Sequence, residues 1–193
     1  EKNKVLKENI HLLDNQKKLV YFFGYALLIT VTVVIIDGFI QYFTGTILVG
    51  YPKWANGRLS GFLKDEGLGR YLTYLIPLMF AMIAIKKNIK TYEIIFAMVL
   101  LTLVDVLTYL SGERTSFILL IMSTLIIITG VSRFKYLRAS FFILSILLAI
   151  FFTIKDPDVR YRIIDTSIND LGLGNKNINI INSQYDGLYT TAY

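Results

Sequence analysis

Cysteine is absent from this sequence of 193 residues, and histidine occurs once, at His11. Without cysteine the chain can form neither a disulfide nor a thiolate metal site. A single histidine also excludes a metal site built from several imidazoles. The N-terminal stretch lacks the features of a signal peptide with a cleavage site. The composition therefore predicts no disulfide framework and no metal site of either kind, and we expect no cofactor.

Charged residues are scarce as well, at 18%, whereas hydrophobic residues make up 54% of the chain and the mean hydropathy is +0.55. A soluble domain of this length is rarely so apolar. The net charge of +6 could suggest a nucleic-acid partner in a soluble protein. In a membrane protein the same charge is expected from loops rich in Lys and Arg. We predict membrane lipid, and no nucleic acid, as a partner.

The apolar residues occur in blocks long enough to cross a bilayer, whose hydrocarbon core needs about 20 helical residues. The sequence predicts an all-α polytopic membrane protein with about five transmembrane helices. The predicted spans are 19–36, 71–85, 92–110, 115–132 and 139–154. We expect a structured loop at 37–70, and a polar C-terminal segment from 155 to 193 that begins a large loop.

The distribution of Lys and Arg predicts which loops face the cytoplasm. One alternating set of loops holds 11 of these residues in 31 positions, and the other holds 9 in 78. The denser set should be cytoplasmic; it comprises 1–18, 86–90 and 131–138. The other set should lie together on the outer face, and comprises 37–70, 111–115 and 155–193.

Two arginines in the outer set are candidate anion ligands. Arg114 lies beside Glu113 and directly before Thr115 and Ser116, which are suitable N-caps for the fourth helix. A helix N-terminus with an adjacent Arg favours phosphate binding. Arg58 lies between glycines that would let backbone approach a ligand. The alternatives are a charge pair that marks a tight loop, for Glu113 and Arg114, and a solvated turn, for Arg58.

Three further polar residues are candidates for supporting roles. Asp105 lies inside a predicted span, where a carboxylate costs roughly 2.5–3.5 kcal/mol. It should face a partner, either as an orienter of an arginine or as a structural hydrogen-bonding centre. Asp37 and Gln41 are four residues apart and therefore share one helical face. They either line the same cavity as the arginines or cap the first span at the interface.

The segments GRLSGFLKDEGLGRYLTYLIPLMF and LSGERTSF, in this order, resemble the bacterial O-antigen ligase and O-antigen polymerase superfamily. The shared features are an Arg-x-x-Gly segment before a membrane helix and a Gly-Glu-Arg-Thr motif that opens a later helix. The upstream DGFIQYFTG is similar to the acidic-plus-Gln opening of that region. The resemblance extends from about Asp37 to Thr115 and is weaker through residue 193.

The resemblance implies a metal-independent glycosyltransferase of the GT-C type in the bacterial inner membrane. Such enzymes pass a glycan from an undecaprenyl-pyrophosphate carrier to a saccharide or lipid acceptor at the periplasmic face. Arg58 and Arg114 match the arginines that hold the pyrophosphate. The family's catalytic His should lie in the large loop, beyond Tyr193. We therefore expect the chain to be an internal stretch of a longer protein, inactive alone.

The ligase and polymerase reactions differ in acceptor, and the sequence leaves both open. A polysaccharide or lipid transporter (a flippase component) is the main alternative function. It predicts charged residues near mid-membrane in several spans and an internal repeat. A non-catalytic membrane scaffold is the other alternative, and it predicts that Arg58 and Arg114 lie apart.

Overall fold

The computed structural model is all-α, and it describes residues 2–48, 50, 52–53, 57–62, 67–86, 89–165 and 168. These residues form six α-helices and one π-helical turn. The elements are α1 Lys2–Thr44, α2 Leu68–Ile85, α3 Thr91–Leu110, α4 Arg114–Gly130, α5 Lys135–Lys155, α6 Pro157–Arg160 and the turn Tyr161–Asp165. Contacts divide the chain into two units, Glu1–Ser145 and Ile146–Tyr193.

Four of the described helices are long and apolar enough to cross a membrane. They are Lys18–Thr44 within α1, and the whole of α2, α3 and α5. The predicted fourth span, 115–132, is the shorter apolar helix α4, with 17 residues. That length is about 26 Å, at the lower limit for a hydrocarbon core of about 30 Å. The all-α class and a multi-pass membrane protein follow from these helices.

The first helix is longer than the sequence predicted at both ends. Residues 2–18, expected only to be polar and cytoplasmic, are helical from Lys2. At the other end the helix does not stop at Asp37 but continues to Thr44, so the loop begins eight residues later than predicted. The physical reason is that Asp37 is fully buried and the loop backbone folds back to meet it.

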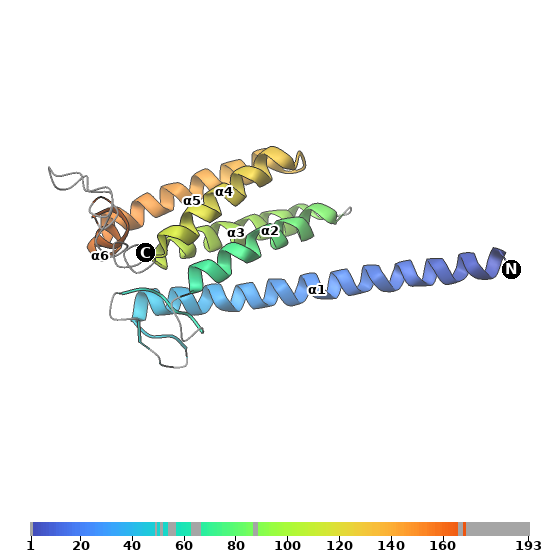
Figure 1. Cartoon of the computed structure of the whole chain (residues 1–193), viewed down its shortest axis with the longest axis horizontal. Helices are drawn as coiled ribbons and strands as arrows, with labels where there is room; N and C mark the ends of the chain where they lie inside the picture. The colour runs from blue at the N-terminus through green and yellow to red at the C-terminus, as the bar shows by residue number, and fades with distance from the viewer. Residues whose placement is uncertain are drawn as a thin grey trace, which may run out of the picture. The chain divides into compact units, whose positions relative to one another are not determined.

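In the first unit, α3 is the central helix and packs against α1, α2 and α4 (Figure 1). Two thirds of α3 is buried, because its apolar residues occupy all sides of the helix. The C-terminal end of α1, the start of α2 and the turn between α3 and α4 meet at one end of this unit. We call this end the loop end; the predicted outer segments 37–70 and 111–115 come together there.

The second unit contains the short helix α6, which begins with its own cap. Asp156 accepts hydrogen bonds from the backbone N–H groups of Asp158 and Val159, and Pro157 occupies the first helical position. Of the predicted C-terminal segment, 155–165 and 168 belong to the described residues. The remainder, and the His expected beyond Tyr193, lie outside them.

Candidate functional site

Gln41 fixes the segment that contains Arg58. Its side-chain oxygen accepts hydrogen bonds from the backbone N–H groups of Ser60 and Gly61, both at 3.0 Å. Its amide nitrogen donates to the Ser60 hydroxyl, also at 3.0 Å. Gln41 is completely buried, so water does not compete for these bonds. The loop after Arg58 is therefore anchored to the last turn of α1.

Asp37 anchors an earlier part of the same loop. Its Oδ1 atom accepts a hydrogen bond from the backbone N–H of Leu48 at 3.0 Å. The predicted shared face of Asp37 and Gln41 is confirmed, since both side chains are fully buried on one side of α1. Both side chains hold loop backbone.

The Arg58 segment then reaches α2 through Gly61. This glycine has a positive φ of 56°, which favours glycine over other residues. A Cβ atom there would lie 2.9 Å from the Leu68 side chain, the first residue of α2. The close approach of Gly61 to Leu68 therefore joins the Arg58 segment to the helix that follows.

Glu113 caps α2 from a different part of the chain. Its carboxylate accepts hydrogen bonds from the backbone N–H groups of Gly69, at 3.0 Å, and Arg70, at 3.1 Å. It also accepts from the Ser116 hydroxyl at 2.7 Å. The first N–H groups of a helix lack partners within it and carry partial positive charge, so a carboxylate is well suited to them. Glu113 therefore joins the turn before α4 to the start of α2.

Arg114 is the first residue of α4, and Glu113 occupies the N-cap position without a side-chain cap. Thr115 and Ser116, predicted as N-caps, lie instead in the first turn. Ser116 donates to Glu113 rather than capping its own helix. Arg114 is half-buried, as is Arg58. Contacts through Gln41, Gly61, Gly69 and Glu113 thus connect the segments of both arginines at the loop end.

Gly69 has no room for a side chain. A Cβ atom would collide with the Ser111 hydroxyl and lie 3.3 Å from the Glu113 Cβ. We expect Gly69→Ala to lower the stability by about 1–3 kcal/mol, because either the turn between α3 and α4 or the start of α2 must move. The measurement is thermal unfolding in mild detergent.

Gly130→Ala is the matched control, since it lies at a helix end with open space around the position. We expect it to be neutral or to stabilise by up to about 1 kcal/mol, from helix propensity. Equal unfolding temperatures for the two variants would contradict the close packing at Gly69.

Asp105 has a partner that the sequence did not predict. Arg138 donates from Nη1 to Oδ2 at 2.9 Å and from Nη2 to Oδ1 at 3.0 Å, a bidentate ion pair. Arg138 also donates to the Thr124 hydroxyl at 2.9 Å, and Ser145 donates to Asp105 at 3.2 Å. Asp105 therefore does orient an arginine and is also a hydrogen-bonding centre, but that arginine is neither Arg58 nor Arg114.

The sequence predicts that Arg138 ends the loop 131–138, but α5 begins at Lys135 and carries Arg138 inward. Its side chain has no exposed surface. A signal was available in the spacing, since Arg138 and Ser145 are seven residues apart and so lie on one face of a helix. The ion pair and its two hydroxyl partners connect α3, α4 and α5.

Comparison with protein-family models, curated proteins and solved structures finds no match to this chain. Within the described part of the chain, no group of three His, Cys, Asp or Glu side chains is arranged to hold a metal ion. The segments of Arg58 and Arg114, which meet at the loop end, are the basis for a functional proposal.

Proposed function

We propose that this chain is the membrane core of a glycosyltransferase that takes a glycan from an undecaprenyl-pyrophosphate carrier. One observation supports the proposal most strongly. The segments of Arg58 and Arg114, 56 residues apart in sequence, both meet the start of α2: Gly61 packs against Leu68, and Glu113 accepts hydrogen bonds from Gly69 and Arg70. Both segments are also those that resemble the O-antigen ligase and polymerase superfamily. By that resemblance, the loop end faces the periplasm of a bacterial inner membrane.

The proposed chemistry uses permanent positive charge. When the bond between the sugar C1 and the pyrophosphate oxygen breaks, its electron pair goes to that oxygen, and negative charge develops there. Guanidinium groups remain protonated and can bind phosphate in a bidentate manner. Fixed charges of this kind stabilise a transition state most when little water is present. Arg58 and Arg114 would hold the leaving group, with Gln41 and Glu113 as positioning residues.

The acceptor hydroxyl oxygen forms the new bond to C1, and its proton passes to a base. The resemblance assigns this base to a His beyond Tyr193. A ligase would use a lipid A core acceptor and a polymerase a growing polysaccharide, and both remain within the proposal.

A transporter or flippase component is the second candidate, and the Asp105–Arg138 pair favours it. Ionisable side chains inside a membrane commonly mark transport pathways. Here, however, the two charges face each other at 2.9 Å and are completed by hydroxyl groups of Thr124 and Ser145. An ion pair with these partners is equally expected of a structural contact between helices.

The fate of the donor distinguishes the two functions. The test uses the full-length protein in sealed vesicles with a labelled undecaprenyl-pyrophosphate glycan and an acceptor. A transferase releases undecaprenyl pyrophosphate and places the label on the acceptor. A transporter leaves the labelled lipid intact and moves it to the other leaflet, and that result would overturn the proposal.

A further inference from the structure

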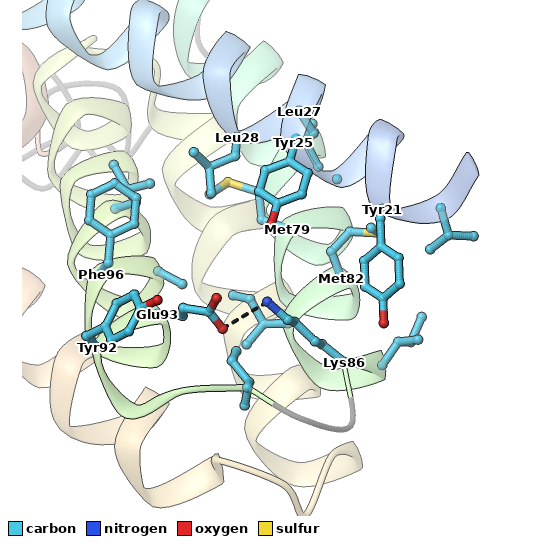
Figure 2. Close-up of a pocket in the computed structure, with 17 residues that line it drawn as sticks. Tyr21, Tyr25, Leu27, Leu28, Met79, Met82, Lys86, Tyr92, Glu93 and Phe96 are labelled. Atoms are coloured by element: carbon cyan, nitrogen blue, oxygen red, sulfur yellow. Dashed lines mark hydrogen bonds and ion pairs between the residues drawn. The ribbon is translucent and has the colours of Figure 1, made fainter. Parts of the chain in front are cut away.

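A large apolar groove lies at the other end of α2 and α3, away from the loop end. It has a volume of about 850 Å³ and is lined by α1, α2 and α3 (Figure 2). Its walls include Leu28 from α1, Met79 and Ile83 from α2, and Phe96 and Leu100 from α3. All of these residues belong to helices that are long and apolar enough to cross a membrane. The groove is therefore expected to open to the hydrocarbon region of the bilayer.

The helices α1 and α2 form two walls of the groove and contact each other. At Gly24 a Cβ atom would lie 2.6 Å from the Met82 methyl carbon, so the Met82 side chain packs directly on the α1 backbone there. On either side of that contact α1 lines the groove with the exposed side chains of Tyr21 and Tyr25. Side chains of α1, α2 and α3 therefore line the groove on three sides.

One end of the groove is polar and carries an ion pair. Lys86 points into it from the end of α2 and donates to Glu93 at 2.8 Å, with Tyr21 and Tyr25 on the facing helix (Figure 2). The hydrogen bond with Glu93 raises the pKa of Lys86, so the ammonium group stays charged. An ammonium group has three N–H donors, so one bond to Glu93 leaves capacity for a second anion. Lys86 is 28% exposed and can reach such an anion.

The sequence around Lys86 is positive overall. Residues 86–93 contain three lysines and one glutamate, a net charge of +2. Lys90 lies over the ring of Tyr92, whose side chain also lines the groove. Lysines and tyrosines together are typical of the membrane–water interface. The density of Lys and Arg places this end at the cytoplasmic leaflet, where anionic lipids attract basic segments.

We propose that the groove binds one anionic phospholipid of the surrounding bilayer. An acyl chain lies along the apolar walls, and the phosphate group lies at Lys86 and Lys90. A phospholipid matches the change from the apolar walls to the polar end, which adjoins the basic segment 86–93. A second copy of the chain, or another helix, would match the apolar part but would gain nothing from the polar end. This inference does not depend on the transferase proposal, because the two sites lie at opposite ends of α2.

Native mass spectrometry in mild detergent tests the site with phosphatidylglycerol and phosphatidylcholine added in equal amounts. The wild-type protein should retain phosphatidylglycerol in preference. Lys86→Gln should reduce that preference about fivefold, because a lysine near the surface contributes about 1 kcal/mol to binding of anionic lipid. Lys135→Gln is the control, since Lys135 also lies at the predicted cytoplasmic end but outside the groove. An unchanged preference in Lys86→Gln would overturn the headgroup assignment.

Leu28→Trp tests the acyl-chain position, because the larger side chain would fill the groove from α1. It should reduce the retention of both lipids, whereas Ile29→Trp, which adds the same bulk one residue away and outside the groove, should not. Equal retention in these two variants would overturn the proposal, and so would recovery of the wild-type protein as a dimer that buries the groove.

A second measurement needs no variant. Phosphatidylglycerol with a diazirine in its acyl chain should label peptides from α1, α2 and α3 of the wild-type protein at the groove. Labelling confined to other surfaces would contradict the site.

Discussion

Arg138→Met is expected to destabilise the protein by about 3–5 kcal/mol, the usual cost when one member of a buried ion pair is removed. The substitution leaves the Asp105 carboxylate almost fully buried, with a hydrogen bond from the Ser145 hydroxyl in place of the bidentate ion pair. Because the neighbouring helices are apolar, no water is expected to replace the guanidinium. Most of the protein should then fail to elute as a folded species in mild detergent.

The double variant Asp105→Leu, Arg138→Met should recover much of the lost stability. With both charges removed, apolar side chains of similar size fill the space, and such replacements are often neutral or stabilising by about 1–4 kcal/mol. Lys135→Met, on the first turn of the same helix, is the control and should change stability by about 0.5 kcal/mol or less. A double variant as unstable as Arg138→Met would show that the pair is required for more than charge compensation.

Arg58→Lys and Arg114→Lys are each expected to reduce glycan transfer by the full-length protein about 10²–10³-fold. Lysine keeps the charge but presents a single ammonium group, so it cannot bind a pyrophosphate in the bidentate manner of a guanidinium. Stability should be nearly unchanged, because both residues are only half-buried. Transfer is measured as labelled glycan on the acceptor in membranes from cells that express each variant.

Arg133→Lys is the matched control for this pair. Arg133 lies between α4 and α5, where it donates to the backbone carbonyl of Ala84 at 2.8 Å, away from the loop end. It should leave transfer within about twofold of wild type, as is common for surface substitutions. Near-normal transfer by Arg58→Lys or Arg114→Lys would remove the corresponding arginine from the proposed pyrophosphate site.

The helical class and the positions of the spans were predictable because each depends on a local property of the sequence. An uncharged run such as 19–36 is long enough for a bilayer whatever surrounds it, and only a helix satisfies its backbone there. The ends of the helices were less predictable. Asp37 ends the uncharged run but not the helix, since a buried carboxylate that accepts a backbone N–H is compatible with continued helix.

The candidate site was predicted in part. The order of the spans and the charge of the loops predicted that the regions of Arg58 and Arg114 lie on the same side of the membrane. The structure has both regions at one end of the helices. Glu113 caps the start of α2 by accepting hydrogen bonds from Gly69 and Arg70, which lie more than 40 positions away in sequence. Neither segment alone predicts this cap. The same holds for the three hydrogen bonds of Gln41 to Ser60 and Gly61.

The sequence by itself determined that the chain is helical and apolar, and that Asp105 needs a partner inside the protein. Only the tertiary structure decided that this partner is Arg138 and that Glu113 serves two helices. The physical reason is that hydrophobic length and the cost of burying a charge are properties of single segments. A hydrogen bond depends on which two segments lie within about 3 Å of each other, and packing of the whole unit sets that distance.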